Sequence, residues 1–475
     1  MRLTLLDIRR ILAATCVGMS QDSSMAHPKG AAIDSRAVKE GDLFFCLPGE
    51  RVDGHSFAAT AVDKGALAVI AARNPFSSTP PPVPVLLVED VASALGALGA
   101  AHRTSADATV VGVTGTSGKT SVKEVLSTVL AEHGVTAKNH MNLNNQIGLP
   151  LSMLNAPAEA AYWVMEVGIS RPQDMDELGA MLRPDIAVIL NVGAGHLEEL
   201  GGKGVAYHKA RLLAYVVRGG HALVNADYPD LVAEAVQANA GVTFFSAKRA
   251  DRDFFAAYMG PDGLRGKYSL VLKGQEVEVS APFQGEFGAE NMAAVGAVAH
   301  TLGLPMEEIA GGMAKAILPA QRFSVRNAGA YVLIDDSYNA NPLSMERMLE
   351  TARDMARARG EKLVLVLGEM GELGSESPQL HKKLGRAIAA ATPERIYWKG
   401  RYASEVREGV MDAGGICSFT ALDCTEDFAA IAGEFPSSGV VLFKGSRSNK
   451  LETLIAAFDE AIGFGDTGKG HHNVV

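Results

Sequence analysis

The sequence predicts an α/β protein built from three successive units. Its length of 475 residues corresponds to three domains at about 150 residues each. A hydrophobic fraction of 47% with 21% charged residues is typical of a well-cored globular chain, and it excludes intrinsically disordered, collagen-like and coiled-coil proteins. Short apolar runs alternate with helical patterns, which indicates strands joined by helices and therefore mainly parallel sheets.

Charge and the N-terminal segment limit the partners of the chain. The formal net charge of −10 argues against a general binder of duplex nucleic acid or of anionic membranes. Asp7, Arg9 and Arg10 interrupt the N-terminal apolar segment, so no signal peptide is expected, and no apolar run is long enough for a membrane span. The four cysteines form no C-x-x-C pair, which favours a reducing compartment. We expect a cytoplasmic protein with neither a nucleic acid nor a membrane as partner.

The first unit, residues 1–105, mixes short strands with a closing helix. Apolar runs predict strands at 42–47, 66–72 and 83–89, and the pattern of 91–103 predicts a helix. The proline-rich stretch at 75–84 is expected to form a surface loop rather than a domain boundary.

The second and third units, residues 106–323 and 324–475, repeat a pattern of strand, loop and helix. This alternation predicts sheets with helices on both faces. In the second unit, the expected strands are 108–113, 161–168, 185–193 and 221–225, with a helix at 119–134. In the third unit, the expected strands are 331–336, 362–368, 395–400 and 439–445, with helices at 344–359 and 449–464.

A glycine-rich loop at 112–121 follows the first strand of the second unit and precedes a helix. In that position backbone N–H groups and the helix N-terminus can hold phosphates, Lys119 can neutralise their oxygens, and the Thr120 hydroxyl can bind Mg²⁺. The spacing departs from a strict G-x-x-x-x-G-K-[ST], because Val113 stands where that pattern needs glycine. The alternative is a glycine-rich turn that only begins a helix.

The segment T-G-T-S-G-K-T at 114–120 resembles the phosphate loop of the Mur ligase family, which forms amide bonds through acyl phosphates at the expense of ATP. The motifs at 34–36, 41–44 and 49–55 are similar to the family's UDP-binding signature. Those that resemble its dipeptide-adding branch lie at 142–150, 335–342, 367–374 and 444–447.

The resemblance implies a fold and a reaction. It implies a small UDP-muramoyl-peptide-binding domain at 1–105, a central P-loop-type ATPase domain with a mainly parallel sheet at 106–323, and a C-terminal Rossmann-like domain at 324–475. The last would close over ATP and bind the incoming dipeptide. The implied activity joins D-Ala-D-Ala to UDP-N-acetylmuramoyl tripeptide in cytoplasmic peptidoglycan precursor synthesis, by a monomer.

The phosphoryl-transfer step brings two anions together, so cations must offset their repulsion. Glu166 ends a strand at its carboxyl edge, where ligands bind in open α/β sheets, and His196 follows the next strand. By resemblance both are ligands, with Thr120, of two Mg²⁺ ions, and Lys209 carries a carbamate formed from CO₂ that supports the metal. The alternatives are a strand-capping carboxylate, a structural histidine and a solvated lysine. The predicted catalytic residues are Lys119, Glu166, His196 and Lys209.

Other site residues are also implied by the resemblance. The predicted nucleotide-binding residues are Gly115, Thr116, Ser117, Gly118, Lys119, Thr120, Ser121, Asn291, Arg322 and Asp336. The predicted substrate-binding residues are Ser35, Arg36, Asp53, His55, Asn142, Asn145, Tyr338, Asn339 and Arg447. Arg447 and Glu452 could equally form a charge pair at a helix N-terminus.

The chain departs from the family pattern at Arg171, Phe287 and Arg211, where the family commonly has histidine, histidine and an acid. The substrate contacts near Arg171 are therefore open. The tripeptide could end in diaminopimelate or in lysine.

Other functions fit the sequence less well. The alternatives within the family are a sibling ligase that adds a single amino acid and a relative that acts on a different carboxylate. The sibling that adds the third residue is disfavoured because no D-N-P-R-like stretch is present. A non-catalytic relative would be expected to have lost some of the catalytic residue types, a kinase would need a base for a hydroxyl acceptor, and a dehydrogenase would not carry G-K-T in its glycine loop.

Overall fold

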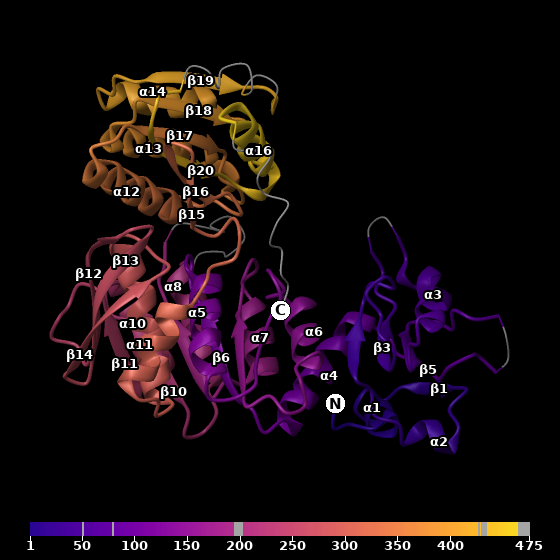
Figure 1. The fold of residues 1–475 in the computed structure, drawn as a ribbon. Helices are drawn as coiled ribbons and strands as arrows, with labels where there is room; N and C mark the ends of the chain where they lie inside the picture. The colour runs from indigo at the N-terminus through magenta and orange to yellow at the C-terminus, as the bar shows by residue number, and fades with distance from the viewer. Residues whose placement is uncertain (50–51, 78–79, 194–202, 426–427, 429–434, 464–475) are drawn as a thin grey trace.

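The computed structural model describes residues 1–475 apart from 50–51, 78–79, 194–202, 426–427, 429–434 and 464–475. Its named strands form three sheets of five, nine and six strands, which follow one another along the chain. In Figure 1 the third sheet and its helices stand above the second, and the first unit extends to the side. The predicted α/β class is confirmed. Within the described residues, no helix combines the length and the apolar character needed to cross a bilayer.

The first sheet has the strand order β1-β5-β4-β3-β2, with β1 antiparallel to β5 and the other neighbours parallel. Leu151 and Leu154 of the second unit pack into the core of the first, so the two units share a hydrophobic contact. The elements are α1 (Leu5–Ile11), β1 (Thr15–Val17), α2 (Gln21–Ser24), β2 (Gly30–Ala32), β3 (Asp42–Phe45), α3 (Ala58–Asp63), β4 (Ala68–Ala71), β5 (Val85–Leu87) and α4 (Val91–Ser105).

The second sheet has the order β14-β13-β12-β11-β10-β9-β6-β8-β7. All neighbours are parallel except the two hairpins that join β12, β13 and β14. Its strands are β6 (Thr109–Thr114), β7 (Thr136–Lys138), β8 (Tyr162–Glu166), β9 (Ile186–Ile189), β10 (His221–Asn225), β11 (Val242–Ser246), β12 (Phe254–Asp262), β13 (Arg265–Leu272) and β14 (Gln275–Ala281). Its helices are α5 (Lys119–Ala131), α6 (Gly148–Leu154), α7 (Asp174–Leu182), α8 (Val205–Ala210), α9 (Pro229–Ala238), α10 (Glu286–Thr301) and α11 (Met306–Lys315).

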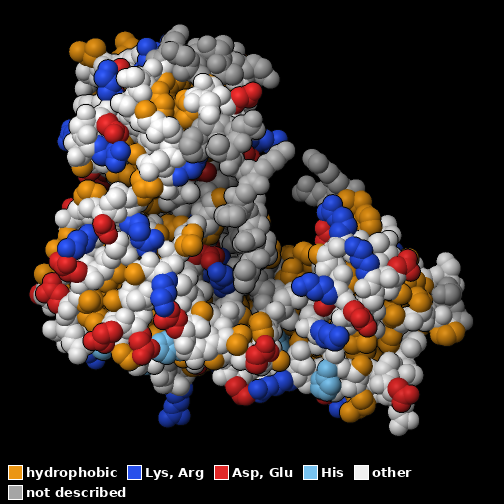
Figure 2. Space-filling model, viewed as in Figure 1, with side chains coloured by type: hydrophobic (Ala, Val, Ile, Leu, Met, Phe, Trp, Pro, Cys, Tyr) orange, Lys and Arg blue, Asp and Glu red, His pale blue; other side chains and the backbone are white. Residues whose placement is uncertain are grey.

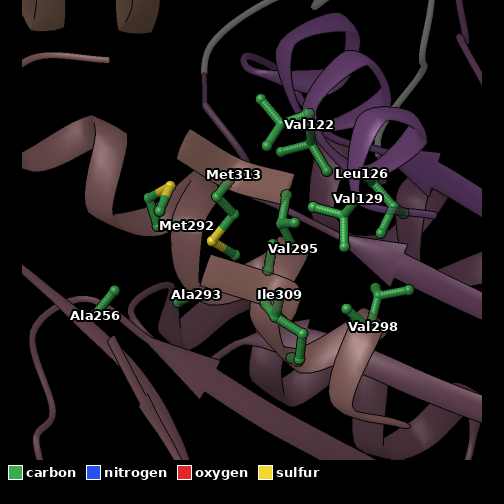
Figure 3. Close-up of a cluster of buried hydrophobic side chains, with 14 of the residues drawn as sticks. Val122, Leu126, Val129, Ala256, Met292, Ala293, Val295, Val298, Ile309 and Met313 are labelled. Carbon is green, nitrogen blue, oxygen red and sulfur yellow. The ribbon is translucent and has the colours of Figure 1, made fainter. Parts of the chain in front are cut away.

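Helices cover both faces of the second sheet, as predicted for a mainly parallel sheet. On one face α5, α10 and α11 pack together, and Figure 3 shows Val122, Leu126 and Val129 of α5 turned toward Val295 and Met313. On the other face the core includes side chains of α6, α7 and α9. This packing fixes α5, which begins at the glycine-rich loop, against the sheet.

The third sheet has the order β15-β16-β20-β17-β18-β19, and β15 is the antiparallel edge strand. Helices α12, α13 and α14 contribute to the core on one face, and α16 to the core on the other. The predicted closing helix at 449–464 is shorter, because a 3₁₀ turn (Arg447–Asn449) precedes it. The elements are β15 (Ser324–Ala328), β16 (Tyr331–Asp336), α12 (Pro342–Arg359), β17 (Leu363–Gly368), α13 (Ser377–Ala391), β18 (Arg395–Lys399), α14 (Ala403–Asp412), β19 (Ser418–Leu422), β20 (Gly439–Lys444) and α16 (Glu452–Ala461).

The parallel register of three central strands builds one edge of the site. Val113 of β6 pairs with Glu166 of β8, and Thr114 pairs with Ile189 of β9. The glycine-rich loop after β6, the Glu166 carboxylate and the segment after β9 therefore leave the sheet side by side at its carboxyl edge.

Candidate functional site

A cleft of about 830 Å³ opens at this edge, between the second and third units. Its walls include the whole glycine-rich loop from 115 to 121, the segment 144–146 and the start of α12. In Figure 2 the surface is also hollowed between the first and third units. The predicted site residues that line the cleft are Gly115, Thr116, Ser117, Gly118, Lys119, Thr120, Ser121, Asn142, Asn145, Glu166, Lys209, Arg322, Asp336, Tyr338 and Asn339.

The glycine-rich loop is held in shape by the strand next to it. The Asn191 side chain accepts from the N–H of Ser117 at 2.8 Å and donates to the Ser117 carbonyl at 3.1 Å. Gly118 has a φ of 84°, and a Cβ there would lie 2.5 Å from Oδ1 of Asn291. Only glycine meets both conditions. Sequence reasoning missed Asn191, whose one signal is its place at the end of a strand.

The glycine-rich loop presents hydrogen-bond donors to the cleft. Among the described residues no side chain caps the N-terminus of α5, so its first N–H groups are open to a bound anion. The Lys119 ammonium donates to the carbonyl of Gly115 at 2.9 Å. Burial is the main cause that lowers the pKa of Lys119. This arrangement suits a phosphate chain.

Thr120 and Glu166 form an oxygen pair beside the loop. The Thr120 hydroxyl donates to Oε2 of Glu166 at 2.8 Å, and Asn144 donates to Oε1 at 2.7 Å. Asn139 braces the backbone of Glu166 in both directions, accepting from its N–H and donating to its carbonyl. Glu166 is 2% exposed.

A hydroxyl and a carboxylate are oxygen ligands of the kind that Mg²⁺ prefers. The oxygen pair of Thr120 and Glu166 would therefore suit a magnesium ion. In the described part of the chain, no group of three or more His, Cys, Asp or Glu residues could hold a metal by itself. His196, the other predicted ligand, lies outside the described residues.

Lys209 is the second buried cation of the cleft. It lies on α8, is 3% exposed, and its amine has no hydrogen-bond partner among the described residues. Burial, with a smaller effect of the Lys119 charge, lowers the pKa of Lys209 well below its ordinary value. A larger share of its amine is therefore neutral than in a free lysine, and the neutral amine is the form that can react with CO₂.

The end of the second unit and the start of the third contribute an opposing wall. The Arg322 guanidinium lies 3.8 Å from the ring centre of Tyr338. Asp336 accepts from Lys444 at 2.5 Å and from the N–H of Phe323 at 3.0 Å. Both oxygens of Asp336 are therefore engaged, so a ribose would have to share or displace these bonds.

Some predicted residues lie away from the cleft. Asn291 is 1% exposed, lies behind Gly118 and does not line the cleft, although its amide nitrogen has no partner among the described residues. Arg447 is paired with Glu452 at 2.8 Å, which is the charge-pair alternative. Neither residue lines the cleft, although Asn291 packs against the predicted nucleotide-binding residue Gly118.

The predicted UDP contacts all belong to the first unit. Arg36 pairs with Asp34 at 2.7 Å and lowers the pKa of that carboxyl to about 2. Asp53 accepts from His55 Nδ1 at 2.6 Å and from Arg73. His55 also accepts from the N–H of Ala72 through Nε2, so both of its ring nitrogens are used internally. Ser35 is buried at 6% exposure.

The three departures from the family pattern have distinct surroundings. Arg171 lines the cleft and is held by Asp174 at 2.9 Å. Phe287 also lines it and meets Phe323 edge to face, with ring centres 5.8 Å apart. Arg211 points to Asp176 at 2.7 Å, away from the cleft lining.

Comparisons with known proteins cover almost the whole chain. Three family models match in order: the catalytic domain of the Mur ligase family at 27–103, the Mur ligase middle domain at 113–299, and the Mur ligase glutamate ligase domain at 321–447. A UDP-N-acetylmuramoyl-tripeptide–D-alanyl-D-alanine ligase of Escherichia coli is 34% identical over 90% of this chain and 93% of its own length. The enzyme of the same name from Bacillus subtilis is 30% identical, with 95% and 97% covered.

Solved structures agree with this assignment. A crystal structure of MurF from Acinetobacter baumannii superposes with a TM-score of 0.84 at 31% identity, covering 96% of this chain and 98% of that one. MurF ligase from Thermotoga maritima, in complex with ADP, gives 0.78 at 29% identity, with 92% and 98% covered. The chain therefore belongs to the Mur ligase family.

Proposed function

We propose that this chain joins D-alanyl-D-alanine to UDP-N-acetylmuramoyl tripeptide, with ATP as the energy source and Mg²⁺ as the cofactor. The observation that carries the proposal is the Thr120–Glu166 oxygen pair beside the phosphate loop, facing Arg322 and Asn339 across the cleft. The named activity of the E. coli and B. subtilis relatives supports the choice of substrates.

The reaction needs two displacements in one closed site. In the first, a carboxylate oxygen of the tripeptide attacks the γ-phosphorus of ATP, and ADP leaves. In the second, the dipeptide amine attacks the acyl carbon, an amide bond forms, phosphate leaves and the amine loses a proton. Water would hydrolyse the acyl phosphate, so the units must exclude it between the steps.

The residues of the cleft have separate tasks in this scheme. The N–H groups of the loop and Lys119 hold the phosphates, and Lys119 exchanges its bond to Gly115 for a phosphate oxygen. Thr120 and Glu166 would hold Mg²⁺, which would supply positive charge beside the transferred phosphoryl group. We further propose that Lys209 works as a carbamate, which replaces a buried positive charge by an anion that supports the metal.

The division into domains at 1–105, 106–323 and 324–475 forms part of the proposal, as do a second Mg²⁺ ion, a cytoplasmic location and a monomeric state. Changes of sheet along the chain, between β5 and β6 and between β14 and β15, support the two boundaries. Gel filtration with light scattering tests the monomeric state.

The decisive experiment measures phosphate release from ATP with UDP-N-acetylmuramoyl tripeptide, with and without D-Ala-D-Ala, together with the product mass. The expected result is phosphate release that depends on both substrates, with a product heavier than the tripeptide substrate by one D-alanyl-D-alanine unit. Turnover that requires a different amine would move the function to a sibling ligase. Failure to turn over with any amine would contradict an enzymatic role.

A further inference from the structure

A cluster of three polar side chains, of which Glu290 is buried and the other two are partly buried, joins the second and third units next to the cleft. Arg347 comes from α12, Glu290 from α10, and Tyr228 from the segment before α9. The Nη2 of Arg347 donates to both Glu290 oxygens, at 2.7 and 2.6 Å, and to the Tyr228 hydroxyl. Tyr228 in turn donates to Glu290 at 2.9 Å. The side chains of Arg347 and Glu290 are 10% and 8% exposed.

Arg347 has donors left over. All its hydrogen bonds to the described residues use Nη2, so Nε and Nη1 have no protein acceptor there. A guanidinium carries five N–H donors, and neither Nε nor Nη1 of Arg347 is among the fully buried atoms that lack a partner, so both nitrogens reach open space. Arg347 lines the cleft. Its free edge therefore has an acceptor only if the cleft holds a ligand or ordered water.

The surroundings of Arg347 match the less charged part of a nucleotide. Phe287 lies one turn before Glu290 on α10, and Met348 follows Arg347 on α12; both line the cleft. Phe287 packs edge to face on Phe323, so an apolar and aromatic wall adjoins the guanidinium. A purine ring stacks on such a wall, and its ring nitrogens and the ribose hydroxyls are acceptors for an arginine.

We infer that Arg347 binds the base or ribose of the nucleotide, and that Glu290 and Tyr228 hold it in position from the opposite unit. One side chain then contacts both the nucleotide and the second unit, so a bound nucleotide strengthens the junction between the units. The inference rests on the proposed function only in taking the cleft as the nucleotide site.

The test compares two affinities in matched variants of the full chain. Arg347→Met alone would leave the buried Glu290 carboxylate unpaired and could unfold the junction. We therefore use Glu290→Gln as the background and add Arg347→Met to it. Calorimetric titration with Mg²⁺ present measures the Kd of ADP and, separately, of pyrophosphate, which has no base or ribose.

The expected result is a Kd for ADP about tenfold higher in the double variant than in Glu290→Gln, as for the loss of one charge-assisted hydrogen bond. The Kd for pyrophosphate should not change. Arg353→Met, which removes an arginine of the same helix that pairs with Asp354, is the control and should leave both affinities unchanged.

Three outcomes would overturn the inference. Equal ADP affinity in the two variants and in the unmodified chain would mean that Arg347 only joins the units. An equal loss for ADP and pyrophosphate would mean general damage to the cleft. Absence of ADP binding by the unmodified chain would refute the proposed function as well, which separates that failure from the first two.

Discussion

The hydroxyl of Thr120 donates to the carboxylate of Glu166 at 2.8 Å, although the two residues lie on different elements, 46 positions apart. The parallel pairing of β6 with β8 produces this contact, because it sets Glu166 opposite Val113 at the edge where the phosphate loop begins. The oxygen pair is thus a direct consequence of the strand order. It is also the part of the cleft where a divalent cation has oxygen ligands ready.

Glu166→Gln should abolish most of the activity while leaving the fold intact, because the amide keeps the shape but removes the charge that binds Mg²⁺. We expect kcat to fall by about 100-fold or more, since a bound cation contributes several kcal/mol to the transition state. Product formation from ATP, measured over a range of Mg²⁺ concentrations, gives this fall in kcat and its dependence on Mg²⁺. Glu132→Gln, in a surface ion pair with Lys315, is the control; equal Mg²⁺ curves for both variants would contradict the assignment.

Asn144→Ala should weaken Mg²⁺ binding without removing a metal ligand. Asn144 orients Glu166 through Oε1, and partners of this kind are worth about 10–100-fold in metal affinity. The expected pattern is a raised Mg²⁺ requirement, with kcat largely recovered at saturating Mg²⁺. A kcat that stays low at every Mg²⁺ concentration would assign Asn144 to another task. Asn145 lies next to Asn144 but accepts from backbone N–H groups of its own loop. Asn145→Ala is therefore not expected to raise the Mg²⁺ requirement.

Local patterns were enough to predict the parts of the fold that depend on few neighbours. The strands before and after the phosphate loop and helices α5, α12 and α16 follow from runs of apolar residues with a clear period, whereas α13 and α14 were not predicted. The hairpins of β12, β13 and β14 were missed. The buried positions of β13 alternate with half-exposed ones, so its apolar signal is diluted by polar residues such as Lys267 and Ser269.

The residues of the site likewise divide into those that a local motif predicts and those that it does not. Lys119, Thr120 and Glu166 were predictable because each lies in or next to a short motif at a strand end. Arg347 and Glu290 were missed, because they are 57 positions apart and nothing in the sequence links them, although Glu290 directly precedes the predicted Asn291. Their contact depends on how two units meet, which a pattern within one segment does not contain. Asn291 lies near the predicted loop, but only the packing of α10 decides that it is behind Gly118.

Activity should depend on CO₂ through Lys209. The lowered pKa of this buried amine makes the neutral, reactive form available well below the ordinary lysine pKa of 10.5. We expect low activity in CO₂-depleted buffer, recovery on adding bicarbonate, and no recovery for Lys209→Met. Lys203→Met is the matched control, since Lys203 is exposed and lies over Tyr207. Full activity without CO₂ would refute the carbamate.

The same lowered pKa affects stability with a definite sign. Between the folded and the unfolded pKa of Lys209, the unfolded chain binds more protons than the folded one. The free energy of unfolding of the uncarbamylated protein should therefore gain a contribution as pH rises through this range toward 10.5. Lys209→Met should remove that contribution, which denaturation in CO₂-free buffers at several pH values measures. An identical pH dependence for both proteins would contradict it.

The ion pair of Lys444 and Asp336 should hold the third unit together where it faces the cleft. The Lys444 side chain is 2% exposed, binds Asp336 at 2.5 Å and donates to the carbonyl of Asn339 at 3.1 Å. Lys444→Met leaves a largely buried carboxylate without its cation, so we expect the free energy of unfolding to fall by about 3–5 kcal/mol. Lys444→Met with Asp336→Asn should recover part of the loss, because no charge is then left unpaired.

Trp398 is buried in this unit and Trp163 in the second, so fluorescence in a Trp163→Phe background follows the unfolding of the third unit alone. Lys383→Met, which removes a surface ion pair with Glu346, should change stability by less than about 1 kcal/mol. If Lys444→Met were as mild as this control, Asp336 would not depend on Lys444 and would be free to turn toward a ribose.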